Sequence, residues 1–190
     1  MAGFIRQYGP LKLKVERAPS IFSALSEAIV YQQLSGKAAG TIHGRFCALF
    51  DEGLPEAKQA AAISLTQLRQ VGLSQNKALA ILDLAQKSRD GSLASLRGLA
   101  RKSDEDVIEN LVQVRGIGPW TAQMFLIFNL GRPDVMPAAD LGIQKGVQRV
   151  YRMRKLPDPK QVLQRTVHLA PYRSAASWYF WRAADTALMS

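Results

Sequence analysis

The sequence predicts an all-α protein of about ten helices. Strand-like alternation of apolar and polar residues is nearly absent, because only residues 10–19, PLKLKVERAP, alternate, and these predict a short extended arm. From Ser20 onward the apolar residues recur at helical spacing, and the connections are short, with no low-complexity linker. An apolar fraction of 47% in 190 residues suits one medium domain or two small lobes that share a core.

The first helices follow from caps and breaks in the pattern. Ser20 can cap a helix whose apolar residues repeat every 3.6 positions. A break at Ser35 and Gly36 separates it from a second helix, which we expect to end near residues 51–53. Pro55 suits the first turn of a third, short helix, because its missing N–H would have no partner there.

The middle of the chain predicts three further helices. Ser64 or Thr66 caps the first of them. Ser74 starts a long helix, SQNKALAILDLAQKSRDG, which Gly91 ends. Another short helix spans about residues 93–100.

A helix, a glycine hairpin and a strongly apolar helix follow, over about residues 104–130. Ser103 is a good helix start, because the three acidic residues behind it suit the positive end of the helix dipole, and the helix runs to Val114. In VRGIGPW, Gly116 and Gly118 let a phosphate approach the main chain closely. The next helix, PWTAQMFLIFNLG, is apolar on almost every face and should be the buried centre. Its N-terminus offers N–H groups to an anion, although Gly-x-Gly between helices is often only a tight turn.

Three helices end the sequence, over about residues 140–153, 158–168 and from Pro171 onward. Asp140, in the run MPAADLGIQKG, lies at the start of the first of them and twenty positions beyond Trp120. An Asp at a helix start is most often a cap, so its position alone does not indicate catalysis.

Charge and composition narrow the class of protein. Twenty-five Lys and Arg against fifteen Asp and Glu give a formal net charge of +10, which favours a polyanionic partner. No apolar run approaches the roughly 18 residues that span a bilayer, so we expect no membrane partner and a cytoplasmic location, with the nucleoid if the host is bacterial. The single Cys47, read as a buried residue, excludes an internal disulfide and any site built on several thiolates. His43 and His168 are isolated and are read as structural or surface residues.

Four stretches, in the same order along the chain, resemble the motifs of the HhH-GPD DNA glycosylases. Residues 32–39, QQLSGKAA, resemble the DNA-intercalating turn, and residues 72–81, GLSQNKALAI, resemble a segment before the central helix. Residues 111–125, LVQVRGIGPWTAQMF, resemble the helix-hairpin-helix, and residues 131–140, GRPDVMPAAD, resemble the segment that ends in the family's acid. Within the superfamily the chain is most similar to the alkylation-repair branch, the DNA-3-methyladenine glycosylases of type II.

The resemblance implies a fold and a partner. The fold would be the HhH-GPD glycosylase fold, with its helices in two lobes that flank a DNA-binding cleft. Residues 21–190 would form the catalytic domain and residues 1–20 an arm packed on the C-terminal lobe. The chain resembles a minimal form, without the extra N-terminal domain of larger relatives and without the iron–sulfur loop of others. Double-stranded DNA that contains damaged bases would be the partner, and the protein would be a monomer.

The resemblance also implies a reaction, with Asp140 as the catalytic residue. Cleavage of an N-glycosidic bond develops positive charge on the sugar, and one carboxylate can stabilise that cation and activate a water. An alkylated purine such as 3-methyladenine leaves readily, so no second acid is needed; 7-methylguanine, 1-methyladenine and ethenoadenine are further candidate substrates. Bifunctional relatives carry Lys where this chain has Trp120, so we expect a monofunctional enzyme without lyase activity.

A flipped base needs a pocket and a plug for the gap that it leaves. Leu34 matches the family's apolar wedge, and Gln33 beside it can contact the orphaned base. Aromatic faces recognise a cationic base. The candidates for the pocket are Trp120, Met124, Phe22, Tyr31 and Trp181, with Tyr172 and Trp178 as further aromatic residues. Apart from Trp120, most of these aromatic residues lie at helical spacing, for which core packing is the default. Met124 stands where larger relatives have Tyr, and HLAPYR lacks their stacking Trp, so shape is expected to contribute much of the selectivity.

Contacts with the DNA backbone are expected from main-chain N–H groups and two lysines. The residues are Gly116, Gly118, Thr121, Lys37 and Lys145. No organic cofactor or iron–sulfur cluster is expected, but the family hairpin often holds Na⁺ or K⁺ through main-chain carbonyls, here those of Val112, Val114 and Ile117. Two alternatives stay open: a non-catalytic helix-hairpin-helix module that only binds DNA, and a glycosylase for another class of lesion.

Overall fold

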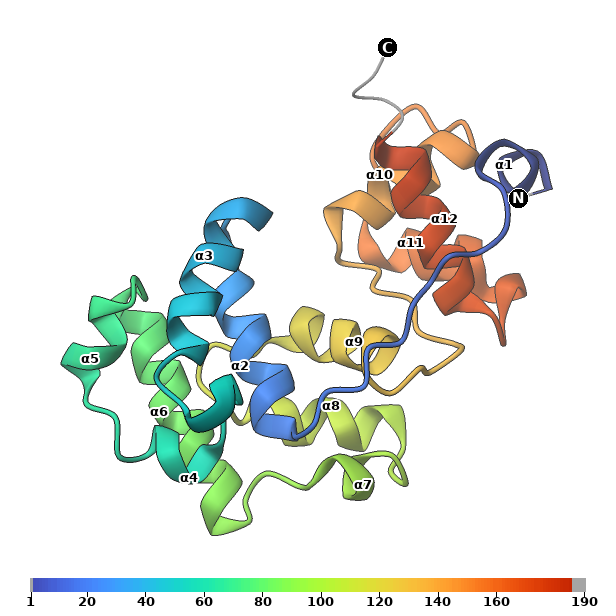
Figure 1. Ribbon diagram of the computed structural model, residues 1–190. Coiled ribbons are helices and arrows are strands. Elements are labelled where there is room, and N and C mark those ends of the chain that lie inside the picture. Colours follow the sequence, from blue (N-terminus) through green and yellow to red (C-terminus); the bar gives the residue numbers. More distant parts are fainter. Residues whose placement is uncertain (1, 186–190) are drawn as a thin grey trace. The chain divides into compact units, whose positions relative to one another are not determined.

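The computed structural model describes residues 2–185, which form twelve α-helices, two short 3-10 helices and no β-strand (Figure 1). This confirms the all-α class, with two more α-helices than the ten expected. Met1, in the predicted arm, and residues 186–190, in the predicted catalytic domain, lie outside the described residues. The elements are α1 (Ala2–Tyr8), α2 (Ile21–Tyr31), α3 (Gly36–Cys47), η1 (Asp51–Gly53), α4 (Ala57–Ala60), α5 (Leu65–Gln70), α6 (Gln75–Asp90), α7 (Leu96–Leu99), α8 (Asp104–Val112), α9 (Pro119–Phe128), α10 (Leu141–Val150), α11 (Pro159–Thr166), η2 (Val167–Leu169) and α12 (Arg173–Asp185).

Most predicted helix starts are confirmed, because a serine hydroxyl accepts a first-turn N–H at each of them. The capping residues among those predicted are Ser20, Ser64, Ser74 and Ser103. At α5 the cap is reciprocal, since the Gln67 side chain also accepts the Ser64 N–H. Gly91 ends α6 in the left-handed conformation, with φ of 83°.

Several elements differ from the prediction: α8 ends at Val112 rather than Val114, and α7 is shorter than the predicted residues 93–100. Helix α1 was not expected. Helix α3 ends at Cys47 rather than near residue 51, because Phe50 is extended and buried. Pro55 precedes Glu56, the N-cap of α4, and so lies outside that helix. Helix α12 begins at Arg173 rather than Pro171.

The start of α12 is set by two acceptors that lie far away in the sequence. The Arg173 N–H donates to Asp134 Oδ1 over 3.1 Å, and the Ser174 N–H donates to Pro133 O over 2.9 Å. The Arg173 side chain also pairs with Asp134, and this hydrogen-bonded guanidinium holds the pKa of that carboxyl below its ordinary value. No local pattern could have indicated this start.

The chain divides into two compact units. Residues 17–125 form one, here called the hairpin unit, and residues 1–16 with 126–190 form the other, here called the carboxylate unit. The N-terminal residues therefore group with the C-terminal ones: α1 packs on α12, and the Tyr179 hydroxyl donates to Gly9 O over 3.0 Å.

In the hairpin unit the long helix α6 is central. Helices α2, α4 and α5 pack against it, and α3 packs on α2. The core side chains are apolar and fully buried: Leu25, Ile29, Phe46, Ile81, Leu84 and Leu111. The apolar helix α9 begins in this unit and contributes the buried Ala122 and Phe125.

In the carboxylate unit α10 and α12 make the main contact. Their shared core includes Ile143, Val147 and Phe180. Gly146 permits this packing, because a Cβ there would lie 2.1 Å from the main-chain oxygen of Phe180. Within residues 2–185, no helix is long and apolar enough to cross a bilayer.

Candidate functional site

The hairpin between α8 and α9 is a tight turn that depends on glycine. The Ile117 N–H donates to Val114 O over 3.0 Å, and Gly116 adopts a φ of 77°, which side chains rarely tolerate. Ile117 is buried and anchors the turn in the core. Pro119 is the first residue of α9, so the turn leads directly into a helix N-terminus, where N–H groups lack acceptors within the helix.

Two side chains that lie far from the hairpin in the sequence hydrogen-bond to its main chain. Asp83 on α6 accepts the Arg115 N–H at Oδ2 over 2.7 Å, while its other oxygen pairs with Lys87. Gln32 donates from Nε2 to Gly116 O over 2.9 Å, across 84 positions of sequence. Neither contact was predicted, because nothing in the local sequence indicates which distant residue completes a turn.

The turn after α2 presents Leu34 to solvent. Gln33 takes the left-handed conformation with φ of 56°, and Leu34, which follows, is 39% exposed. Lys77 on α6 holds the base of this turn, since its ammonium donates to Val30 O and Gln32 O, both over 2.7 Å. Burial lowers the pKa of the Lys77 amine below its ordinary value. An exposed leucine on a rigid turn has the form of the predicted wedge.

A pocket of about 630 Å³ lies between this turn and the start of α9. Its lining includes three of the five predicted pocket residues, and the full set is Ala28, Tyr31, Gln32, Gln33, Gly116, Trp120, Thr121 and Met124. Trp120 is 47% exposed, so the otherwise buried helix α9 offers an aromatic side chain at its first turn. The volume lies within the range of small-molecule sites.

The other aromatic candidates do not line this pocket. Phe22 is only 1% exposed and packs against Phe50, as the core-packing interpretation predicts. Trp178 is buried beneath Arg182 and beside Tyr179, as core packing predicted. Helical spacing could not distinguish these core rings from the exposed ring of Trp120.

Asp140 is the N-cap of α10 in the carboxylate unit. Its Oδ1 accepts the Ile143 N–H over 2.8 Å and the Trp181 indole N–H over 2.9 Å. Trp181 thus belongs to the surroundings of the acid, and its ring stacks on Phe128 with centroids 6.0 Å apart. The predicted cap is confirmed, and it holds the carboxylate in a defined orientation.

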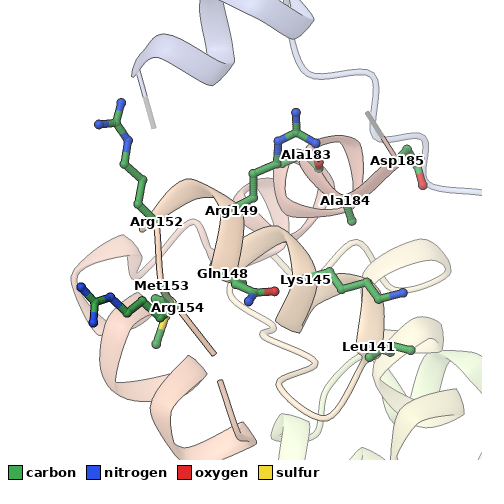
Figure 2. A pocket seen from close by; sticks show the side chains of 11 residues that line it. Leu141, Lys145, Gln148, Arg149, Arg152, Met153, Arg154, Ala183, Ala184 and Asp185 are labelled. Carbon is green, nitrogen blue, oxygen red and sulfur yellow. Dashed lines mark hydrogen bonds between the residues drawn. The ribbon is translucent and has the colours of Figure 1, made fainter. Parts of the chain in front are cut away.

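The face of α10 beyond Asp140 is strongly basic. A pocket of about 970 Å³ lies along it (Figure 2), and four cationic side chains border it: Lys145, Arg149, Arg152 and Arg154. Asp185 is the acidic residue in its lining, and Arg149 donates to Ala183 O over 3.4 Å. Lys145, one of the predicted backbone contacts, is exposed here, and Lys37 is exposed at the start of α3. Thr121, a further predicted contact, is buried at the first turn of α9.

Neither histidine belongs to a metal site within residues 2–185, where no group of three or more His, Cys, Asp or Glu could hold an ion. His43 stacks with Phe46 and approaches Cys47, whose Sγ lies 3.6 Å from His43 Nε2. His168 meets the ring of Tyr151 edge-on. Burial raises the pKa of the half-buried Cys47 thiol, which disfavours the reactive thiolate.

Comparison with known proteins gives a consistent result. A family model for the HhH-GPD superfamily base excision DNA repair protein matches residues 27–171. DNA-3-methyladenine glycosylase 1 of Schizosaccharomyces pombe is 34% identical over 184 residues, covering 96% of this chain and 80% of that protein. The structure of a DNA-3-methyladenine glycosidase from Bacillus halodurans has a TM-score of 0.88 at 36% identity, covering 100% of this chain and 86% of that one. The S. pombe enzyme Mag1 in complex with abasic DNA has a TM-score of 0.85 at 33% identity, covering 95% of this chain and 89% of that one.

Proposed function

The chain belongs to the HhH-GPD superfamily of base excision DNA repair proteins, and from this premise we propose that it is a monofunctional DNA glycosylase for alkylated purines. Its similarity to enzymes named for 3-methyladenine supports that base as the first substrate, with 7-methylguanine, 1-methyladenine and ethenoadenine as further candidates. The observation that carries the proposal is Asp140, a carboxylate held by two N–H donors at the position that the family motif assigns to its acid.

The reaction is the hydrolysis of one bond. As the N-glycosidic bond breaks, the base leaves with the bonding electrons and the sugar gains cationic character. Asp140 stabilises that charge and accepts a proton from the water that attacks the sugar carbon. In 3-methyladenine, 7-methylguanine and 1-methyladenine, methylation has already placed positive charge on the base, so no protonation of that leaving group is required. Trp120 supplies no amine for a Schiff base, so the DNA strand stays intact.

The hairpin unit binds and opens the duplex in this proposal. Main-chain N–H groups at Gly118 and the first turn of α9 hold a phosphate, and Lys37 adds charge. Leu34 enters the base stack, Gln33 contacts the orphaned base, and the flipped purine lies against Trp120, Tyr31 and Met124. In the carboxylate unit, Lys145 contributes a further contact with the backbone.

We propose that main-chain carbonyls of the hairpin hold a monovalent cation. Val112, Val114 and Ile117 supply neutral main-chain oxygens within six residues, and the Val114 oxygen, which accepts the Ile117 N–H, has a second lone pair. Carbonyl oxygens are the ligands that replace water around such ions. A bound Na⁺ or K⁺ would add positive charge for a phosphate. We propose no other cofactor, and we propose that the protein acts as a monomer in the cytoplasm.

The function is tested by release of free base. The protein is incubated with duplex DNAs that carry 3-methyladenine, 7-methylguanine, 1-methyladenine, ethenoadenine or hypoxanthine, and released base and strand breaks are measured separately. We expect release of 3-methyladenine without strand cleavage. DNA binding without release of any base would instead support the non-catalytic module, and release of hypoxanthine alone would indicate another class of lesion.

A further inference from the structure

The carboxylate of Asp140 is held by a side chain 41 positions further along the chain. Trp181 on α12 donates its indole N–H to Asp140 Oδ1 over 2.9 Å, and the Ile143 N–H donates to the same oxygen over 2.8 Å. The main-chain donor fixes this oxygen at the end of α10, and the ring donor approaches it from a second helix. Together they restrict the rotation of the carboxylate.

Trp181 is itself held firmly. Its ring is half-buried and stacks on Phe128 with an interplanar angle of 24°. Its helix α12 makes the main contact of the unit with α10, the helix that Asp140 caps. The indole N–H therefore has a fixed direction, and a donor with a fixed direction can orient its acceptor.

Gly142 provides the space for this contact. A Cβ at position 142 would lie 2.9 Å from Trp181 Cδ1 and 3.0 Å from Asp140 Oδ1. Real Cβ atoms essentially never come as close as 2.9 Å to such an atom, so a side chain at this position would displace the indole or the carboxylate. Glycine in the first turn of a helix weakens the helix relative to alanine. The close approach of Trp181 explains why glycine nevertheless occurs at position 142.

We propose that Trp181 is a positioning residue for base excision: its N–H, in the space that Gly142 leaves, holds Asp140 in the reactive orientation. This assigns Trp181 to the acid rather than to the base pocket, and it rests on the proposed function. A misplacement of a catalytic group by about 1 Å can lower a rate by about 100-fold. Loss of the indole N–H should therefore reduce excision without reducing the affinity for DNA.

The first test compares two tryptophans of the same helix. Trp181→Phe keeps a ring to stack on Phe128 and removes the N–H donor together with the second ring of the indole, a loss of volume that the control at Trp178 also has. Trp178→Phe changes an equally aromatic residue that contacts Tyr179 and Arg182. Single-turnover release of 3-methyladenine from methylated duplex DNA is measured, together with the Kd for abasic-site DNA and the Tm.

We expect Trp181→Phe to slow release by about 10- to 100-fold, within the range that misplacement of a catalytic group can cause. Trp178→Phe should keep the rate of the wild type. Both variants should keep the Kd for abasic DNA.

The second test is a double-mutant cycle with Gly142→Ala. Alanine should support α10 at least as well as glycine, so a loss of rate with an unchanged or raised Tm points to the crowded contact. If Gly142→Ala acts through the indole, combining it with Trp181→Phe should give a loss well below the product of the two single losses.

The outcomes separate this inference from the proposed function. An unchanged rate in Trp181→Phe would overturn the positioning role while the wild type still released base. An equal loss in Trp178→Phe, or fully multiplicative losses in the cycle, would also overturn it, because the effect would then be general. Failure of the wild type to release any base would remove the proposed function and this inference with it.

Discussion

The two units hold their functional groups in opposite ways. In the hairpin unit, the atoms expected to meet DNA include main-chain N–H groups and one exposed leucine. Three side chains that lie far away in the sequence, Gln32, Lys77 and Asp83, hold the turns that present them. In the carboxylate unit, one side chain carries the chemistry, and one main-chain N–H and one indole fix it. A substitution in the hairpin unit should therefore cause a partial loss of DNA binding, whereas a substitution of the catalytic carboxylate should remove most of the activity.

The largest expected effect is that of Asp140→Asn. Asparagine caps a helix as well as aspartate does, so the fold and the affinity for DNA should be kept, but the charge that stabilises the sugar cation is lost. We expect release of 3-methyladenine to fall by about 1,000-fold, within the range of general acid–base and electrostatic contributions. The measurement is the single-turnover rate beside the Kd for abasic DNA.

Asp158→Asn is the matched control, because Asp158 also caps a helix of the carboxylate unit, α11, through its Oδ1. It should leave the rate unchanged. If Asp140→Asn retained the wild-type rate, or if it lost binding as strongly as activity, the contrast between a binding unit and a catalytic carboxylate would not hold.

Gly146→Ala tests the packing of α10 against α12 in the carboxylate unit. The new Cβ would lie 2.1 Å from Phe180 O and 2.6 Å from Phe180 C, both main-chain atoms that cannot move without shifting α12. We expect the free energy of unfolding to fall by about 3 kcal/mol, as for a severely overpacked core. Denaturant titration measures it.

Gly44→Ala is the corresponding control in the hairpin unit. A Cβ at Gly44, inside α3, would meet nothing within 4 Å, so alanine should leave stability unchanged or raise it by up to about 1 kcal/mol. Equal effects of the two substitutions would mean that α10 and α12 are not as closely packed as the structure shows.

The features that depend on residues close together in the sequence could be predicted, and those that depend on residues far apart could not. The serine caps, the hairpin and Asp140 follow from local rules, because a cap and its N–H lie three residues apart. The hydrogen bond from Gln32 to Gly116 joins residues 84 positions apart, and the one from Trp181 to Asp140 joins residues 41 positions apart. Trp181 and Phe22 have the same helical spacing as any core aromatic residue, so the sequence could not separate a ring that orients an acid from one that only fills the core.

Leu34→Ala tests the binding side of the comparison. Removal of the apolar wedge should weaken the complex that holds a flipped base, since unstacking costs a few kcal/mol per step and the leucine offsets part of it. We expect about a tenfold weaker Kd for abasic duplex DNA and a similar loss in the rate for duplex substrate, with the rate on single-stranded substrate unchanged. Leu54→Ala, at another exposed leucine of the same unit, should have no effect. Equal losses on single and double strands would contradict the role of a wedge.

The smallest effect is expected for Gln32→Ala, and it tests whether the hairpin is held by several contacts. The variant removes the amide donor to Gly116 O, while Asp83 still accepts the Arg115 N–H on the other side of the turn. A single neutral hydrogen bond contributes about 1 kcal/mol, so stability and the affinity for abasic DNA should each fall by no more than about this amount. Gln70→Ala, at an exposed glutamine at the end of α5, serves as the control.

The double variant Gln32→Ala with Asp83→Ala, which removes both side-chain contacts to the hairpin, then tests the comparison. If the two side chains share the same turn, their combined effect on affinity should exceed the sum of the single effects, because the hairpin loses its last lateral support. Strictly additive losses would mean that Gly116 and its neighbours hold the hairpin conformation by themselves. The hairpin unit would then depend on local geometry, and its difference from the carboxylate unit, where a remote indole orients the acid, would be larger.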